Sequence, residues 1–452
     1  MKIYIQFKDF GKINSGRIDI SNFTVFVGEN NSGKTFVMQL IYAVQKEICN
    51  SNIFSGEIID IADYVDINTD IIKKIEAEIN RYLGSNKERI IEKYFHRAIP
   101  IGELKVDIEL YDAKIYIKNE RKDRVINSDG DRKDTSYVSI GLKVPNKKEV
   151  KHGLFYFGKD DKYLSKALCS QVISVILGSG YSSDSILFLP ASRTGMQLLY
   201  KYFFSEKDKK ENELMFDYDF ENKKEIRKEN ELGLTVPVYD FLQFLLRYSV
   251  SENNSKENSG LIKFIESNLI DGELLENGGE TLYRQSVEDE LTPLYLASSM
   301  VNEISPIFKV LTGKVNYKTL LYDEIETCLH PEKQKQMARL LVRMNNAGYK
   351  LIVSTHSDTM AAKLNNLLML TYMKENYKQE NIDEKLKKLN LQKEDLLDSC
   401  EFHVYQFVCE EKNRSTIKEL EFNPVTKVGY DFEQFAKSAI DLYEETMQIV
   451  GE

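Results

Sequence analysis

The chain has 452 residues, of which 42% are hydrophobic and 29% are charged, and its formal net charge at pH 7 is −10. This length and apolar content are enough to bury a large core, so a disordered chain is excluded. The acidic balance argues against a surface coated with phosphate-binding side chains, although a local basic groove that binds nucleic acid remains possible.

Cysteine usage and hydropathy indicate the compartment. The five cysteines form no C-x-x-C pair, so neither a zinc site nor a disulfide framework is predicted. No stretch reaches about 18 to 20 consecutive apolar residues, the length that a transmembrane helix needs. The first ten residues, MKIYIQFKDF, alternate like a strand and lack the pattern of a signal peptide. We therefore expect a cytoplasmic protein with no membrane partner.

The opening of the chain predicts strands around a turn at 11–16, followed by an apolar strand at 23–27. The next segment, GENNSGKT at 28–35, precedes a helix-like run and has the P-loop pattern G-x-x-x-x-G-K-[ST]. Its glycines let successive backbone N–H groups point inward, and the helix start adds its dipole toward a bound phosphate. The alternative is a Gly/Asn-rich turn before an ordinary helix.

The P-loop pattern predicts specific ligands of ATP and Mg²⁺. Lys34 is expected to reach the β- and γ-phosphates, and Thr35 is expected to offer its hydroxyl to Mg²⁺. The expected nucleotide-binding residues of this loop are Gly28, Asn30, Asn31, Ser32, Gly33, Lys34 and Thr35.

The long middle of the chain predicts an α+β elaboration. Residues 52–98 carry helical patterning with mixed charge, which is typical of a pair of solvated amphipathic helices. Residues 103–158 alternate between polar and apolar positions with turn residues between them, which predicts an antiparallel sheet. Because no heptad pattern persists for three or four repeats, a coiled-coil arm is not expected.

A further apolar strand at 185–190 leads to Arg193, which is either a ligand of phosphate or of a partner subunit, or the partner of a neighbouring carboxylate. The densely charged segment 205–231 predicts an exposed loop or helix end. Segments 236–250 and 261–270 are patterned as amphipathic helices.

Two more motifs place polar residues at strand ends. The segment TLLYDEIETCLHP (319–331) is an apolar strand that ends in Asp323 and Glu324, one carboxylate to hold Mg²⁺ and one to orient the attacking water. The segment KLIVSTHSD (350–358) is an apolar strand that ends at His356. A βαβ unit would return His356 to the same sheet edge as the carboxylates.

These motifs, together with FLPASRTG (188–195) and LYLASSMVNEI (294–304), resemble the ABC-type ATPase head shared by SMC-like repair proteins and the OLD-like prokaryotic AAA ATPases. The resemblance implies an α/β fold, a bilobed P-loop ATPase head with an inserted α+β region. It also implies that Asp323 is a metal-holding Walker B aspartate, that Glu324 is the catalytic glutamate, and that His356 is a switch histidine that senses the γ-phosphate. With Lys34, the last two are the expected catalytic residues.

The segment LYLASSM (294–300) corresponds to the signature segment of such heads, where a serine and helix N-terminal amides contact the γ-phosphate held by the opposite subunit. Met300 replaces the usual glycine, and either Ser298 or Ser299 is the candidate phosphate ligand. The resemblance therefore implies a homodimer closed on ATP between its heads.

The spacing of the motifs predicts the domain organisation. Asp323 follows Lys34 by 289 positions, too far for a compact transporter ATPase. We expect part of the head with the P-loop at 1–50, an inserted helical and antiparallel β region at 51–185, a continuation of the head with the charged loop at 186–290, and the C-terminal lobe with the tail at 291–452.

The tail predicts a charged helical segment, a strand pair at 401–411 and 414–423, and a final helix at 431–449. OLD-like proteins often carry a C-terminal nuclease, but this tail has no strand-end Glu followed by a D-x-D pair, so no fused nuclease is expected. The resemblance points to a switch that controls a separately encoded effector, a nuclease or toxin of an anti-phage system. The alternatives are a DNA-repair ATPase that clamps nucleic acid and an ATP-gated scaffold with little turnover.

Overall fold

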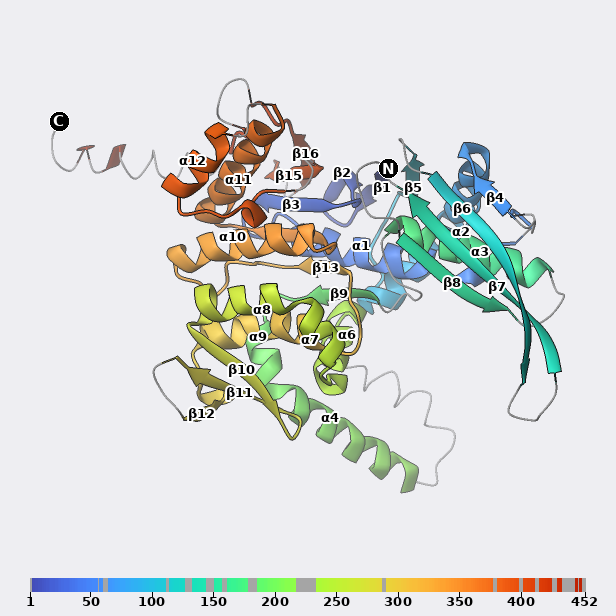
Figure 1. Ribbon diagram of the computed structural model, residues 1–452, viewed down its shortest axis with the longest axis horizontal. Coiled ribbons are helices and arrows are strands. Elements are labelled where there is room, and N and C mark those ends of the chain that lie inside the picture. Colours follow the sequence, from blue (N-terminus) through green and yellow to red (C-terminus); the bar gives the residue numbers. More distant parts are fainter. Residues whose placement is uncertain are drawn as a thin grey trace.

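The computed structural model has a mixed α/β fold with a nine-stranded sheet (Figure 1). The structure describes residues 2–55, 57–59, 64–110, 114–126, 132–143, 150–156, 161–177, 185–216, 233–286, 290–376, 380–397, 401–410, 414–424, 429–432, 444–445 and 447–448.

The sheet combines an antiparallel edge with a parallel centre. From one edge to the other its strands are β5 (Glu103–Glu109), β1 (Lys2–Phe10), β2 (Ile13–Asp19), β16 (Ser415–Leu420), β15 (Phe402–Cys409), β3 (Phe23–Gly28), β14 (Lys350–Thr355), β13 (Thr319–Tyr322) and β9 (Ile186–Leu189). The run from β15 to β9 is parallel throughout. Strands β1, β2 and β5 pair antiparallel, as do β15 and β16.

Four of the parallel strands, β3, β14, β13 and β9, are buried on both faces, which is why their sequences read as nearly continuous apolar runs. Helices cover them on either side, and the buried side chains form two clusters. Phe26 and Ile352 face the cluster that contains helices α1 to α3, whereas Val25 and Val353 face the cluster that contains α8 to α11. The alternation follows the two-residue period of a strand.

The helices that form these layers are α1 (Lys34–Ile48), α2 (Thr69–Phe95), α3 (Asp161–Leu177), α4 (Arg193–Phe216), α6 (Val236–Arg247), α7 (Glu252–Glu257), α8 (Ser259–Ile265), α9 (Ser299–Thr312), α10 (Pro331–Asn346), α11 (Asp358–Asn376) and α12 (Glu380–Lys388). Short helical turns occur at η1 (Ser51–Ile53), η3 (Glu266–Ile270), η4 (Leu294–Leu296) and η5 (Lys393–Asp395).

The sheet topology brings three functional motifs to one edge. Strands β3, β14 and β13 are adjacent, and their registers pair Val27 with Thr355 and Val353 with Tyr322. The carboxyl ends of parallel strands meet at the same edge of a sheet, which is where α/β proteins bind ligands. The P-loop, His356 and Asp323 follow these three strand ends directly.

The middle of the chain differs from the prediction in two places. The expected helix pair within 52–98 is a single long helix, α2, because buried residues such as Ile72, Ile75, Ile79 and Leu83 keep one helical face in register. The predicted antiparallel sheet exists as β4 (Tyr64–Ile67), β6 (Lys114–Ile126), β7 (Arg132–Lys143) and β8 (Val150–Tyr156), but β5 leaves it and extends the main sheet.

A three-stranded sheet was not predicted at all. It comprises β10 (Gly272–Asn277), β11 (Glu280–Gln285) and β12 (Leu291–Pro293). The sequence signal for this hairpin was the Gly278-Gly279 pair between two alternating segments. In the structure both glycines have positive φ, at 59° and 81°, as a tight hairpin requires.

The C-terminal strand pair is confirmed as β15 and β16. Most of the predicted final helix at 431–449, and the charged segment beyond Phe216, lie outside the described residues. No helix in the described part of the chain is both long and apolar enough to span a membrane.

Candidate active site

The loop between β3 and α1 has the backbone that a P-loop needs. Gly28 and Gly33 have φ of 140° and 104°, and Asn31 has φ of 59°. A Cβ atom at Gly28 would overlap the carbonyl oxygen of Phe407, and one at Gly33 would lie 2.5 Å from Ile13 Cδ1. Both glycines are therefore favoured by conformation, and at Gly28 the close approach of the Phe407 backbone also leaves no room for a side chain.

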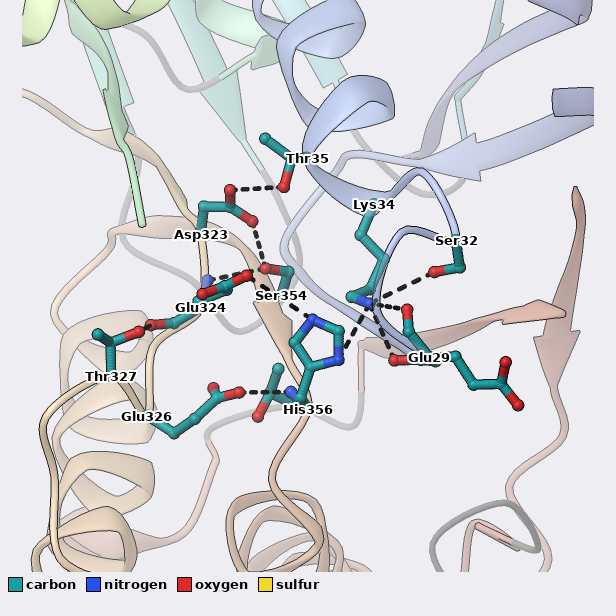
Figure 2. Close-up of polar contacts among 12 residues, drawn as sticks. Glu29, Ser32, Lys34, Thr35, Asp323, Glu324, Glu326, Thr327, Ser354 and His356 are labelled. Carbon is teal, nitrogen blue, oxygen red and sulfur yellow. Dashed lines mark hydrogen bonds and ion pairs between the residues drawn. The ribbon is translucent and has the colours of Figure 1, made fainter. Parts of the chain in front are cut away.

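Lys34 lies inside the curl of this loop. Its Nζ donates to the carbonyl oxygens of Gly28 and Glu29, both at 2.9 Å, and lies 3.4 Å from the Ser32 hydroxyl (Figure 2). The residue is only 4% exposed, and this burial lowers the pKa of its ammonium group to about 8. A partly desolvated cation surrounded by loop backbone is well placed to attract phosphate.

The polar side chains at the tip of the loop differ in exposure. Ser32 is buried, whereas Asn30 and Asn31 are exposed at the tip of the loop. The Asn31 side chain accepts a 2.8 Å hydrogen bond from Lys12 Nζ, which ties the loop to the β1–β2 turn.

Thr35 and Asp323 meet at the start of α1. The Thr35 hydroxyl donates to Asp323 Oδ2 at 2.7 Å, and the Ser354 hydroxyl donates to Oδ1 at 2.5 Å (Figure 2). A hydroxyl beside a carboxylate is an oxygen donor set that suits Mg²⁺. Among the described residues, no group of three or more His, Cys, Asp or Glu is arranged to hold a metal. In nucleotide sites Mg²⁺ is usually bound by one or two protein groups together with phosphate oxygens and water.

Glu324 has an unusual backbone, with φ of 47°. Its N–H donates to the Ser354 hydroxyl at 2.8 Å, and its carbonyl oxygen accepts from Arg193 Nη2 and from the Thr327 hydroxyl, both at 2.9 Å. Burial raises the pKa of its carboxyl group, and the nearby Asp323 adds to the shift. A carboxylate with a raised pKa is a better general base than an ordinary one.

His356 lies between the lysine and the glutamate. Its Nδ1 is 3.4 Å from Lys34 Nζ and its Nε2 is 3.8 Å from Glu324 Oε1 (Figure 2). Burial and the adjacent Lys34 lower the pKa of the imidazole, which favours the neutral ring. Nδ1 is within hydrogen-bonding distance of Lys34, whereas Nε2 faces Glu324.

The two signature serines are not part of this cluster. Ser298 and Ser299 are both exposed at the start of α9, where the Ser298 hydroxyl accepts from the Val301 N–H at 3.4 Å as the N-cap. Among the described residues, no hydrogen bond or ion pair joins either serine to the P-loop. The expectation that this segment begins a helix is confirmed.

The structure decides between the two interpretations of Arg193. The residue is 0% exposed, and its guanidinium forms an ion pair with Glu303, so it is the partner of a carboxylate and not an exposed phosphate ligand.

Two site residues were missed from the sequence. The Ser354 hydroxyl is hydrogen-bonded to both Asp323 and Glu324. The Glu326 carboxylate accepts a 2.5 Å hydrogen bond from the backbone N–H of His356. A polar residue within an otherwise apolar strand was the available signal for Ser354.

A protein-family model matches most of this chain. The family model described as "AAA ATPase domain" matches residues 1–361. The chain belongs to the AAA ATPase domain family. The matched range contains every predicted site residue of this AAA ATPase.

Solved structures similar to this AAA ATPase include an SMC head bound to the C-terminal winged-helix domain of ScpA, at 13% identity and a TM-score of 0.38, covering 94% of this chain and 99% of that one. An SMC head with an extended coiled coil, bound to the C-terminal domain of ScpA derived from Pyrococcus furiosus, matches at 12% identity and 0.36, covering 98% of each chain. The SMC head domain from Thermotoga maritima matches at 11% and 0.34, covering 93% and 100%. No curated protein matches this sequence.

Proposed function

We propose that this AAA ATPase binds Mg²⁺-ATP, hydrolyses it to ADP and phosphate, and acts as a dimeric switch. The supporting observation is one connected set of side chains at the edge of the sheet. Lys34, His356 and Glu324 follow one another at 3.4 and 3.8 Å, and Thr35 is hydrogen-bonded to Asp323 at 2.7 Å. These are the cation, base and metal-binding groups that phosphoryl transfer to water requires.

In the proposed mechanism, the P-loop amides and Lys34 bind the phosphates of ATP. Glu324 orients a water molecule and accepts its proton as the water oxygen attacks the γ-phosphorus and the bond to the ADP oxygen breaks. His356, whose Nε2 is 3.8 Å from Glu324 Oε1, lies beside this reacting region, where it would sense the γ-phosphate. Thr35 and Asp323 would hold Mg²⁺, which neutralises charge on the phosphates when it is bound.

The dimer is supported by the position of the signature segment. Ser298 and Ser299 are exposed and separate from the P-loop of their own chain, so they are free to reach ATP bound by a second copy. The start of α9 also offers unpaired N–H groups, a favourable site for phosphate. ATP held between two copies would close the dimer, and hydrolysis would reopen it.

The output of the switch is a further part of the proposal. On the resemblance to OLD-like ATPases, closure controls a separately encoded effector, a nuclease or toxin in prokaryotic anti-phage defence. Co-purification from the native cell with and without ATP would identify it. A partner retained equally by the parent chain and by a variant that does not bind ATP would contradict the switch.

Nucleotide binding is the first step to test. Lys34→Ala removes the buried cation and should lose most of the affinity for a non-hydrolysable ATP analogue in calorimetry, together with ATP turnover. The matched control is Lys46→Ala, at the far end of the same helix, where the ammonium lies 3.8 Å from Asp240. We expect the control to bind normally. Equal affinity in the parent chain and Lys34→Ala would show that the P-loop assignment is wrong.

A further inference from the structure

Arg193, the first residue of α4, joins two parts of the molecule that are far apart in the sequence. It is completely buried, with its guanidinium above the ring of Tyr322 at 4.3 Å. Nη1 donates to the carbonyl oxygens of Pro190 and Asp323 at 2.8 and 2.6 Å, and Nη2 donates to the carbonyl oxygen of Glu324 at 2.9 Å. The planar guanidinium thus binds the backbone on both sides of the peptide bond between Asp323 and Glu324.

The remaining partner of Arg193 comes from α9. Nη2 forms an ion pair with Glu303, which is also completely buried, and the second carboxylate oxygen of Glu303 accepts from the Thr194 hydroxyl at 2.6 Å. Burial raises the pKa of the Glu303 carboxyl group, and the Arg193 charge opposes that rise. Further along the two helices, Gln197 of α4 is hydrogen-bonded to Ser305 of α9. The N-terminal half of α9 is therefore attached to α4 by polar contacts.

Glu324 is the residue whose backbone depends on these contacts. Its φ of 47° lies in the left-handed region, which a residue with a side chain occupies only when its surroundings hold it there. Ser354 and Thr327, which also hold it, belong to the adjacent strand and to the same turn. Arg193 provides the only one of these three restraints that continues into α9.

We propose that Arg193 and Glu303 form a positioning pair that makes the alignment of Glu324 depend on the position of α9. The N-terminus of α9 carries Ser298 and Ser299, so a contact made there by a second copy would reach the catalytic turn through four residues of helix and one ion pair. Closure of the dimer would then align Glu324 for hydrolysis. This inference rests on the proposed function, because it assumes that Glu324 is the base and that α9 contacts ATP of the partner copy.

The test uses Glu303→Gln, which keeps the size of the side chain and removes its charge. ATP affinity and KM should stay within about twofold of the parent chain, whereas kcat should fall about 10- to 100-fold, because a misplaced catalytic group loses rate and not binding. The residual kcat should also no longer rise with protein concentration as dimers form. Thr194→Val, a milder change to the same carboxylate, should lower kcat in the same way but less.

The matched control is Asp395→Asn. Asp395 is an equally buried carboxylate, bound by Arg339 Nη2 at 2.8 Å and Arg343 Nε at 2.7 Å, and it joins α10 to η5 away from the site. Asp395→Asn should lower the melting temperature without the selective loss of kcat. The positioning role of Arg193 and Glu303 is overturned if Glu303→Gln and Thr194→Val keep the parent kcat, or if Asp395→Asn lowers kcat as much as Glu303→Gln does. Absence of any ATP turnover in the parent chain would instead overturn the proposed function.

Discussion

The two turns that face each other across the site both contain residues with left-handed backbone, but they accommodate this conformation in different ways. The P-loop, 28–35, places glycines at two of its left-handed positions, with φ of 140° and 104°. The opposite turn, 323–330, places Glu324 and Cys328 at φ of 47° and 60°, where no glycine relieves the strain. The first turn is shaped by its own sequence, whereas the second is held by its neighbours.

This difference reflects what each turn has to present. The P-loop offers backbone N–H groups to the phosphates, so its left-handed positions can be glycines and need no side chain of their own. The 323–330 turn has to present the carboxylate of Glu324, and a glycine there would remove the group that the proposed chemistry needs. The backbone strain is accordingly offset by hydrogen bonds: the Glu324 N–H donates to Ser354, and the Glu324 carbonyl oxygen accepts from Arg193 and Thr327.

The largest expected effect is the loss of hydrolysis when the Glu324 carboxylate is removed. Glu324→Gln keeps the shape of the side chain and removes the base, so hydrolysis should fall by about 10²- to 10⁴-fold while ATP still binds. Because the γ-phosphate contacts then persist, the closed dimer should accumulate with Mg²⁺-ATP. Turnover assays and sedimentation velocity with and without nucleotide measure the two effects.

Asp323→Asn is the informative comparison for this variant, because it should instead weaken the Mg²⁺-dependent part of ATP binding. Hydrolysis by Glu324→Gln at the parent rate would show that Glu324 is not the base. If hydrolysis stops but ATP leaves the sedimentation coefficient unchanged, the switch is wrong even though the catalytic assignment stands.

The contrast between the turns also explains what the sequence could predict. Glycines, a lysine and a helix start are local signals, so the P-loop was predicted residue by residue. Asp323, Glu324 and His356 were predicted because each follows an apolar strand, and the sheet order brings those strand ends together.

The supports of the second turn could not be predicted in the same way. Arg193 lies 130 positions from Asp323, and its choice of a carboxylate partner depends on how α4 packs against α9. Similarly, the sequence of β5 alternates like those of β6, β7 and β8. The pairing of β5 with β1 depends on the open edge that β1 presents in the folded sheet.

The second prediction concerns the charge inside the P-loop. Burial lowers the pKa of Lys34 from 10.5 to about 8, so unfolded chains bind more protons than folded ones between these two values. The cost of burying the charged lysine therefore disappears, and stability rises, as the pH increases through that range. Phosphates favour the protonated lysine, so ATP binding above pH 8 must take up a proton. The dissociation constant of a non-hydrolysable analogue should therefore rise by up to about tenfold per pH unit above 8.

Calorimetry from pH 7 to 9.5, in buffers with different ionisation enthalpies, measures both the affinity and the proton uptake. Lys34→Arg is the control, because a guanidinium stays protonated over this range and its binding, although weaker, should not vary with pH. An affinity of the parent chain that stays constant up to pH 9.5 would contradict a lowered pKa for Lys34.

The smallest expected effect compares the backbones of the two turns directly. At most positions alanine is more stable than glycine, by roughly 0.5 to 1 kcal/mol in regular structure. At Glu324 the order should reverse, and Glu324→Gly should be more stable than Glu324→Ala by about 1 kcal/mol, because only glycine escapes the left-handed penalty. Both variants lack the carboxylate, so the difference between them isolates the backbone. Gly33→Ala should be destabilised relative to the parent chain, since it adds the same penalty and a contact with Ile13. Urea unfolding of the three variants measures the differences, and a Glu324→Ala variant more stable than Glu324→Gly would show that the 323–330 turn is not strained.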